Sequence, residues 1–265
     1  MINMPKPKTK IGIIGLGFVG GAVRNWFGKQ KKSAELFLYD KPKGIGSIED
    51  VNRADIIFVA VPTPFIAGKG YDDSAVRESM SIIADGKVVV LKSTVMPRST
   101  ATFQKMHPKK TILFNPEFLR AKTAKQDFLK PDRQIMGFAD AKGKRAARRI
   151  LSILPSAQFV KIMSSTEAEM VKYFGNAFLA NRVIFANQMF DICKAAGIAY
   201  DAVMEGAAND ARIGSSHFNV FDSGYRGYGG PCLPKDVKAL LQFAKSVGAE
   251  TDLLQSLERI NERLG

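Results

Sequence analysis

Cysteine is scarce in this sequence: Cys193 and Cys232 are the only two among 265 residues. Two cysteines do not make the disulfide framework of a small secreted domain, so a reducing, cytoplasmic compartment is predicted. No stretch approaches the roughly 18 uninterrupted apolar residues of a membrane-spanning helix. The N-terminal residues MINMPKPKTK carry lysines without the apolar run of a signal peptide.

Acidic side chains are in the minority, with 25 Asp and Glu against 39 Lys and Arg and a net charge of +14. A basic excess suits nucleic acid, acidic membranes or anionic small substrates. Much of it lies in residues 105–149, where aromatic residues do not alternate with the basic ones as a stacking surface for bases requires. A solvated basic face is therefore expected, with no nucleic acid and no membrane as partner; a nucleic-acid binder is the minor alternative.

The first half of the chain alternates β-branched runs with helical stretches, which predicts a parallel sheet with crossover helices. The fold class is therefore α/β, a Rossmann-like doubly wound sheet. The expected strands are Lys10–Ile14, Leu36–Tyr39, Asp55–Val61, Lys87–Leu91, Thr111–Phe114 and Gln134–Gly137.

Near residue 164 the pattern becomes all-helical, so the predicted domains are 1–163 and 164–265. Thr166 and Glu169 have capping-box spacing, and helical periodicity then continues to Ala196, before Gly197 as a stop. This predicts a helix of about 30 residues, long for a globular protein. Further helices are expected over 198–208 and 236–264, with a glycine-rich loop over 212–230.

The motif GLGFVG directly follows the first predicted strand and opens a helix. Gly15 permits a tight turn, Gly17 lets the backbone approach a pyrophosphate, and Gly20 allows close packing of helix and strand. Asp40 ends the second strand, where a carboxylate accepts hydrogen bonds from ribose hydroxyls and repels a 2′-phosphate. NAD is therefore predicted over NADP, although Lys41 and Lys43 follow at once; a purely structural glycine turn is the alternative. The residues expected to bind the cofactor here are Gly15, Leu16, Gly17, Phe18, Val19, Gly20 and Asp40.

Lys172 and Asn176 lie four residues apart in the long predicted helix and share a face. Such a pair can be a structural hydrogen-bonding pair. It can equally orient a substrate hydroxyl and stabilise negative charge on oxygen as hydride leaves. The residues alone leave both open.

The segment GYGGPCLPKD places Cys232 between glycines and a Pro-Lys-Asp turn. Pro234 suits the first turn of a helix, which would put Cys232 at a helix N-terminus beside Lys235, where a thiolate is favoured. Cys193 lies within a helical stretch and is expected to be a small buried residue. A dinucleotide domain with a nucleophilic cysteine suggests a four-electron oxidation, from alcohol through aldehyde, thiohemiacetal and thioester to acid.

These motifs together resemble the UDP-glucose/GDP-mannose dehydrogenase family, most of all its members that oxidise UDP-glucose. The resemblance covers nearly the whole chain, in the family's order, through GLGFVG, VPTP, STVMPRST, NPEFLRAKTAKQDFLKPDR, EAEMVKYFGNAFLANRVIFAN, DARIG and GYGGPCLPKD. It implies NAD-dependent oxidation of the C6 hydroxyl of a sugar nucleotide, UDP-glucose to UDP-glucuronate, and no metal.

The resemblance also implies roles for individual residues. Cys232 corresponds to the catalytic thiol, Glu117 to a group handling protons or water in thioester hydrolysis, and Thr94 to a threonine near the nicotinamide. Arg212 corresponds to an arginine that reaches the substrate of a neighbouring subunit, so a homodimer through the helical region is implied. Around the reacting carbon stand Lys172, Asn176 and Asp236; along the cofactor Val61, Thr63, Thr94 and Lys235; and along the substrate Glu117, Phe118, Leu119, Arg120, Lys172, Asn176, Arg212, Tyr228 and Gly229.

Plainer readings of three of these residues stay open. Asp236 can be a first-turn carboxylate favoured by the helix dipole, Glu117 an ordinary turn residue, and Arg212 a surface charge.

Two departures from the family pattern affect what is expected. Ala121 stands where the family usually has a glutamate associated with NAD. The affinity or binding geometry of the cofactor is therefore expected to differ from the family's, but the chemistry is not. The sequence also lacks the second α/β domain that covers the uridine, so a truncated or naturally short form and exposed apolar surface are expected. The alternatives are a two-electron 3-hydroxyacid-type dehydrogenase and a non-catalytic NAD-binding homologue. The choice among sugar nucleotides is left open.

Overall fold

The computed structural model describes residues 8–30, 33–120, 123–222 and 224–264. It divides into two compact units: unit 1 is Met1–Pro64 with Asp72–Lys172, and unit 2 is Phe65–Tyr71 with Tyr173–Gly265. One helix, α7 (Ser165–Ala195), runs from the first unit into the second. The domain boundary expected between residues 163 and 164 therefore stays a proposal.

Unit 1 is built on a seven-stranded sheet with the order β2-β1-β3-β6-β7-β8-β9. Its strands are β1 (Thr9–Ile14), β2 (Ala34–Tyr39), β3 (Ile56–Val59), β6 (Val88–Leu91), β7 (Thr111–Phe114), β8 (Arg133–Phe138) and β9 (Phe159–Ser164). The order and the largely parallel pairing confirm the expected doubly wound α/β class.

Two features of the sheet differ from the expectation. β8 pairs antiparallel to β7, so the chain re-enters the sheet at the edge where β7 ends. Residues 115–120 and 123–132 therefore stay at the carboxyl end of the sheet. The second difference is β9, which pairs parallel to β8 in a region expected to hold no strand. Its first half is exposed, so β9 lacks the continuous buried apolar run that marks the central strands.

Helices cover both faces of this sheet because successive strand residues point to opposite sides. Val59 and Leu91 face one core, while Phe58 and Val90 face the other. The first core is closed by α2 (Ile48–Val51), α3 (Ser74–Ile82), α4 (Ser99–Met106) and the first turns of α7; the second by α1 (Phe18–Gly28), α5 (Ala124–Leu129) and α6 (Ala141–Ile153). A short 3-10 helix, η1 (Lys41–Lys43), follows β2.

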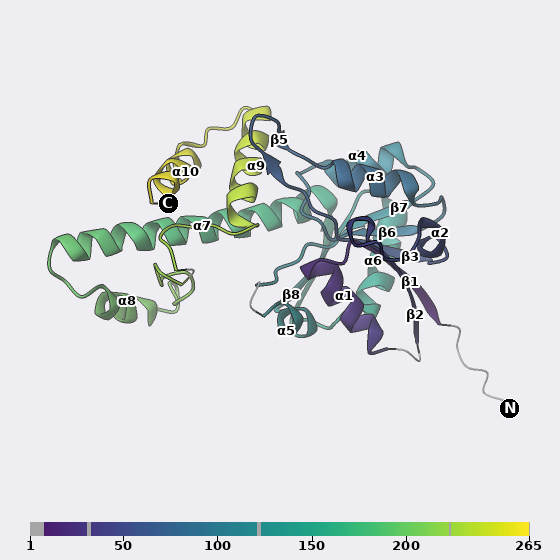
Figure 1. Cartoon of the computed structure of the whole chain (residues 1–265), viewed down its shortest axis with the longest axis horizontal. Helices are drawn as coiled ribbons and strands as arrows, with labels where there is room; N and C mark the ends of the chain where they lie inside the picture. Colours follow the sequence, from purple (N-terminus) through teal and green to yellow (C-terminus); the bar gives the residue numbers. More distant parts are fainter. Residues whose placement is uncertain (1–7, 31–32, 121–122, 223, 265) are drawn as a thin grey trace. The chain divides into compact units, whose positions relative to one another are not determined.

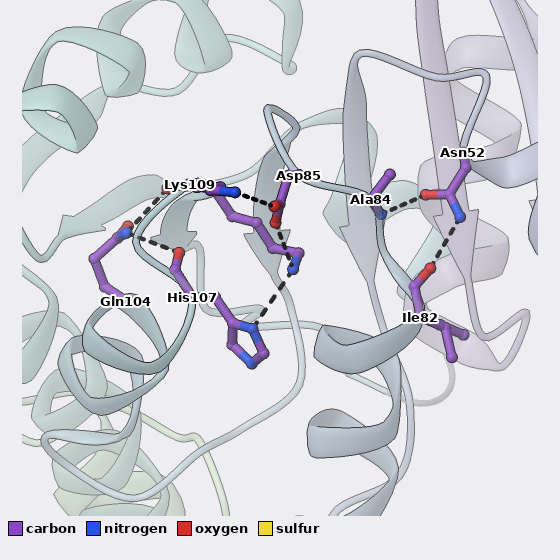
Figure 2. A network of polar contacts seen from close by, with 8 residues as sticks. Asn52, Ile82, Ala84, Asp85, Gln104, His107 and Lys109 are labelled. Atoms are coloured by element: carbon purple, nitrogen blue, oxygen red, sulfur yellow. Dashed lines mark hydrogen bonds and ion pairs between the residues drawn. The ribbon is translucent and has the colours of Figure 1, made fainter.

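A polar network fixes loops at the amino ends of the central strands (Figure 2). The side chain of Asn52 donates to the carbonyl of Ile82 at 2.9 Å and accepts from the amide of Ala84 at 2.8 Å. Asp85 forms an ion pair with Lys109 at 3.5 Å. With the amino ends held in this way, the opposite, carboxyl edge of the strands is the place where an open α/β sheet binds its ligand.

Unit 2 is mainly helical. Its helices are the greater part of α7, then α8 (Tyr200–Ala208), α9 (Leu233–Ser246) and α10 (Asp252–Leu264), together with a hairpin of β4 (Phe65–Ile66) and β5 (Gly70–Tyr71). The helix of 31 residues confirms the expected long helix, and Gly197 follows it with φ +71°. The helical stretch expected over 236–264 is two helices, with Gly248 (φ +72°) between them.

Two small cores hold unit 2 together on opposite sides of α7 (Figure 1). One joins α7, α9 and α10 through Ala180, Val237 and Leu257. The other joins α7 to the loop after α8 through Ala186 and Phe218. Among the residues described, no helix combines the length and apolar character needed to cross a membrane.

The predicted capping box at the start of α7 is wrong by two residues. Glu167 accepts from the backbone amide and the hydroxyl of Ser164, at 2.8 and 2.6 Å, and its own amide points back to that hydroxyl. Glu169 instead turns into unit 1 and accepts the backbone amides of Arg98 and Thr100, at 2.7 and 2.8 Å. It therefore caps α4, a helix far away in the sequence.

Candidate functional site

The glycine loop between β1 and α1 has the geometry that its sequence predicts. Gly15 has φ +85°, and a Cβ there would lie 2.5 Å from the carbonyl oxygen of Ala60. A Cβ on Gly20 would lie 1.8 Å from the carbonyl oxygen of Gly15, so only glycine lets α1 start this close to the loop. Two of the three motif glycines are therefore required by the packing of the protein itself.

Gly17 differs from these two glycines. It is the N-cap residue of α1, and a Cβ built on it would meet no atom of the described residues within 4 Å. Packing among the described residues therefore does not require glycine at this position. A phosphate bound at the first turn of α1 does, because the backbone must approach it closely. The loop fits the pyrophosphate of a dinucleotide on this observation.

Asp40 lies beside the same loop. One carboxylate oxygen accepts the amide of Leu16 at 2.7 Å, and the other accepts the amide of Lys43 at 3.2 Å. The Lys43 ammonium lies 3.6 Å from the carboxylate and donates to the carbonyl of Leu16. The carboxylate is thus fixed next to the glycine loop, where a ribose would follow the phosphates. Of the other loop residues, Phe18 is exposed and Val19 half-buried.

The loops after β3 and β6 carry Val61, Thr63 and Thr94 to the same carboxyl edge. The hydroxyl of Thr63 donates to the carbonyl of Thr94 at 2.8 Å, and that of Ser93 donates to the carbonyl of Val61 at 2.7 Å. Two side-chain hydrogen bonds thus join the two loops. The proposed contacts of these residues with the cofactor stay predictions.

Glu117 and Lys172 form a buried ion pair within unit 1, with Nζ 2.9 Å from the carboxylate. The amide of Leu119 donates to the second carboxylate oxygen at 2.7 Å. Burial disfavours the charge on Glu117, but the charge and hydrogen bond of Lys172 and the amide of Leu119 outweigh it and lower the pKa of Glu117 below its ordinary value. Glu117 is therefore more than a turn residue: it is an ionised carboxylate held at the edge of the sheet.

Phe118 and Arg120, which follow Glu117, both contact charged side chains of unit 1. Phe118 lies close to two cations, with the Arg133 guanidinium 3.9 Å and the Lys172 ammonium 5.8 Å from its ring centre. Arg120 is exposed and pairs with Asp127 at 2.7 Å, so its fork is engaged by a carboxylate of the protein. Ala121, where the family pattern differs, lies outside the described residues.

In unit 2, Cys232 is the N-cap residue of α9, and Pro234 lies in the first turn, as the sequence predicts. The cysteine is exposed, whereas Cys193 is buried in α7 as expected. Asp236, one turn into α9, is buried, and its amide donates to the carbonyl of Cys232 at 3.0 Å. The thiol is thus presented at a helix N-terminus, the environment in which a thiolate is stabilised.

The carboxylate of Asp236 is bound on both oxygens. Lys235 donates to one at 2.5 Å and Asn176 to the other at 2.5 Å. Asp236 is therefore part of a buried polar cluster with Asn176 of α7. It is more than a first-turn carboxylate favoured by the helix dipole. The ammonium of Lys235 is thus engaged by a carboxylate of the protein itself. A contact of Lys235 with the cofactor stays a prediction.

The remaining predicted substrate residues lie in the loop before α9 or near it. Arg212 is 89% exposed at its side chain and pairs with Asp210 at 2.6 Å. Tyr228 is buried, and its hydroxyl donates to Glu258. A Cβ on Gly229 would lie 2.3 Å from the hydroxyl of Tyr225, the end of an exposed side chain that can shift, so packing alone does not require glycine there. Roles in substrate binding stay predictions for all three.

The sequence reading missed two polar residues. Lys92 is buried directly after β6 and bonds to Asn115 at 2.7 Å. A charged residue at the end of an apolar run, VVVL, was the available signal. Arg182 of α7 donates to three carbonyls, those of Ile213, Gly214 and Ser216, at 2.7–2.8 Å. An arginine inside a long helix gives no such signal, because most arginines there face solvent.

Comparison of structures shows the same fold in solved proteins. A UDP-glucose dehydrogenase from Pyrobaculum islandicum superposes with a TM-score of 0.86 at 28% identity, over 99% of this chain and 70% of that one. The 3-hydroxyisobutyrate dehydrogenase of Mycobacterium tuberculosis superposes with a TM-score of 0.73 over 97% of this chain and 94% of that one. At 16% identity, this second likeness shows the fold alone.

Sequence comparison adds relatives and domain assignments. UDP-glucose 6-dehydrogenase AglM of Haloferax volcanii is 32% identical over 248 residues, covering 86% of this chain and 57% of the relative. A UDP-glucose 6-dehydrogenase of Pseudomonas aeruginosa is 34% identical over 235 residues, covering 81% and 50%. The chain thus spans about half the length of the curated relatives it matches.

Two domain models match in order along the chain. Residues 45–154 match the NAD binding domain of the UDP-glucose/GDP-mannose dehydrogenase family, and residues 166–263 match its central domain. NAD is accordingly the cofactor of unit 1, in agreement with the glycine loop and with Asp40. With both domains matched and the fold shared, this chain belongs to the UDP-glucose/GDP-mannose dehydrogenase family.

Proposed function

We propose that this protein oxidises the C6 hydroxyl of a sugar nucleotide twice, from UDP-glucose to UDP-glucuronate, with Cys232 holding the carbon between the two oxidations. The observation that carries the proposal is the exposed Cys232 at the N-terminus of α9, one turn before the buried Asp236–Asn176 pair. A cysteine with only a packing role needs neither exposure nor a helix N-terminus.

The proposed conversion of the alcohol to the acid takes four steps. The first oxidation removes a hydride and a proton from the alcohol and leaves an aldehyde. The Cys232 thiolate adds to the aldehyde carbon and the oxygen takes up a proton, which gives a thiohemiacetal. Loss of a second hydride and proton gives a thioester, and water cleaves it to a carboxylate, a free thiol and a proton. NAD held at the glycine loop and Asp40 would supply the hydride acceptor for each oxidation, so two would be reduced per sugar.

The polar side chains have two proposed tasks: to stabilise the charge on the substrate oxygen and to activate the water. Lys172 and Asn176 lie one turn apart on α7 and are the proposed donors to the substrate oxygen, where negative charge develops. Glu117, kept ionised beside Lys172, is the proposed acceptor of a proton from the water that cleaves the thioester. Asp236 fixes the amide of Asn176 by its hydrogen bond.

A homodimer is also proposed, through the exposed face of α7. Phe174, Phe178, Phe185 and Ile192 are all exposed and large, and their spacing puts them within one stripe of the helix. An apolar stripe of this kind marks a surface that binds another protein. Arg212, exposed in the loop after α8, would then be available to the substrate of the partner copy. The proposed compartment of the protein is the cytoplasm.

The decisive experiment counts the NADH formed per UDP-glucose by the purified protein, with GDP-mannose as a second substrate. Two per sugar are expected for the unmodified protein. Cys232→Ala is expected to lose this stoichiometry, because the aldehyde has no thiol to hold it for the second oxidation. Cys193→Ala, which alters the buried cysteine, is the matched control and is expected to retain two per sugar.

Other outcomes select the alternatives. One NADH per substrate, unchanged in Cys232→Ala, would identify a two-electron dehydrogenase of the 3-hydroxyacid type. No turnover with NAD still bound would identify a non-catalytic homologue.

A further inference from the structure

Asn261 of α10 holds the loop that precedes Cys232. Its Oδ1 accepts the backbone amide of Tyr228 at 2.7 Å, and its Nδ2 donates to the carbonyl of the same residue at 2.9 Å. A Cβ on Gly227 would lie 2.5 Å from this Oδ1, so the loop backbone lies directly against the side chain. One residue of α10 thus satisfies both backbone groups of Tyr228, as a neighbouring strand would.

Glu258, one turn earlier on α10, holds the same loop through its side chain. It accepts the hydroxyl of the buried Tyr228, and its other oxygen lies 3.6 Å from the ammonium of Lys238 on α9. Burial and the contact with Glu258 raise the pKa of Tyr228, so the phenol keeps its proton and stays a donor. Glu258 therefore connects the chain before Cys232 with the chain after it.

The chain between Tyr228 and Cys232 has little to hold it by itself. It reads Gly-Gly-Pro, and Gly230 has φ +72°. Glycine has more backbone freedom to lose on ordering than any other residue. Four Cα–Cα steps join Tyr228 to Cys232, at most about 15 Å of chain, so anchoring Tyr228 limits where the cysteine can lie.

The chain after Cys232 is held through α9. The amide of Asp236 donates to the carbonyl of Cys232 at 3.0 Å and closes the first turn of this helix. Val237, the next residue, packs with Leu257 of α10 in the small core that also contains Tyr228. Cys232 therefore lies between two segments that both pack on α10.

We propose that Asn261 and Glu258 are positioning residues for Cys232: by anchoring Tyr228 they keep the thiol at the N-terminus of α9, where it captures the aldehyde. With the loop released, the thiol occupies many positions and the aldehyde leaves before it is captured. The capture of an aldehyde rests on the proposed function, whereas the anchoring of the loop does not.

Amide hydrogen exchange tests the anchoring without substrate. Asn261→Ala removes both bonds to the Tyr228 backbone, and the amide of Asp236, which bonds to Cys232, is expected to exchange roughly tenfold faster. The amide of Ala244, near the other end of α9, should keep its rate because the change is local. Arg259→Ala, which alters an exposed side chain of α10, is the matched control and should change neither rate.

The yield of NADH separates positioning from a general loss of stability. A thiol out of place lets the aldehyde escape after the first oxidation. Asn261→Ala is therefore expected to fall from two NADH per sugar toward one, with free aldehyde trapped by a hydrazine. A purely structural role would slow turnover and keep two NADH per sugar, and Arg259→Ala should keep both the rate and the two.

Tyr228→Phe is a milder variant that does not depend on Asn261→Ala folding. It keeps the ring and the backbone bonds to Asn261 and loses only the bond to Glu258. Smaller changes in the same direction are expected in both measurements. An unchanged exchange rate of Asp236, an equal change in Arg259→Ala, or two NADH per sugar in Asn261→Ala would overturn the proposal.

The two measurements also separate this proposal from the proposed function. One NADH per sugar from the unmodified protein would reject the four-electron oxidation. Faster exchange of Asp236 in Asn261→Ala would then still support the anchoring of Cys232 by α10.

Discussion

The three motif glycines have separate physical duties at the scale of single residues. Gly15 adopts a positive φ against the carbonyl of Ala60, and Gly20 leaves no room for a methyl group. Gly17 alone of the three has no atom of a described residue within 4 Å of a Cβ built on it. Stability and cofactor binding therefore depend on different glycines of one motif, although the three are equivalent in the pattern.

Gly17→Ala and Gly20→Ala should separate these duties. Gly17→Ala is expected to fold with little change in stability but to bind NAD at least about tenfold more weakly, because the methyl group blocks the approach to the phosphates. Gly20→Ala is expected to lower the free energy of unfolding by about 2 kcal/mol or more through the clash with Gly15. Urea unfolding and calorimetric titration with NAD measure both. Equal losses of stability in the two variants would contradict this division.

Buried carboxylates join elements at the next scale. Glu169 of α7 accepts two backbone amides at the start of α4, where Arg98 has φ 81°. Burial raises the pKa of Glu169 to about 7, and the hydrogen bonds from Thr100 and Arg98 oppose this rise without cancelling it. Glu167, only two residues earlier, is exposed, and its bonds to Ser164 lower its pKa. Two glutamates of one helix turn thus have opposite effects on the pH dependence of stability.

The pH dependence has a definite sign. The folded state retains a proton on Glu169 between its unfolded pKa, near 4.3, and about 7, so its contribution to stability is complete below pH 4.3 and is lost as the pH rises through 7. The loss is on the order of 3 kcal/mol. Urea unfolding at pH 4.5 and 7.5 is expected to show this slope in the unmodified protein and a flatter one in Glu169→Gln. Glu167→Gln is the control and should keep the slope; an unchanged slope in Glu169→Gln would contradict the assignment.

At the scale of the whole molecule, the apolar stripe on α7 has no partner within the described residues of its own chain. Phe174, Phe178, Phe185 and Ile192 remain exposed on a helix that is otherwise well packed. Exposure of four large apolar side chains in one stripe is costly in water, and a second copy of the same helix would cover it.

Charges placed on this stripe should therefore abolish the proposed dimer. Phe185→Asp combined with Ile192→Asp is expected to change the mass in light scattering from that of two chains to that of one. Phe159→Asp, which alters a side chain of equal exposure on β9, is the control and should leave the mass unchanged. A protein that stays dimeric with both charges on α7, or is a monomer without them, would exclude this interface.

Much of the fold followed from local sequence patterns. Six strands, the long helix and its end at Gly197 appear where β-branched runs, helical periodicity and glycine place them, because each of these signals is a property of neighbouring residues. β9 was missed because half of it is exposed at the sheet edge. The direction of β8 was missed because it depends on where the chain re-enters the sheet, and no local pattern encodes that position.

The same division holds for the site. The sequence by itself determined the dinucleotide loop, the residue types at the carboxyl edge of the sheet, and a cysteine at a helix N-terminus, since each follows from motifs of a few adjacent residues. Only the tertiary structure decided that Glu117 pairs with Lys172, that Asn176 and Lys235 share the carboxylate of Asp236, that Glu169 caps α4, and that Lys92 is buried against Asn115. Nearly all of these contacts join residues far apart in the chain, and packing selects them among many partners of equal chemistry.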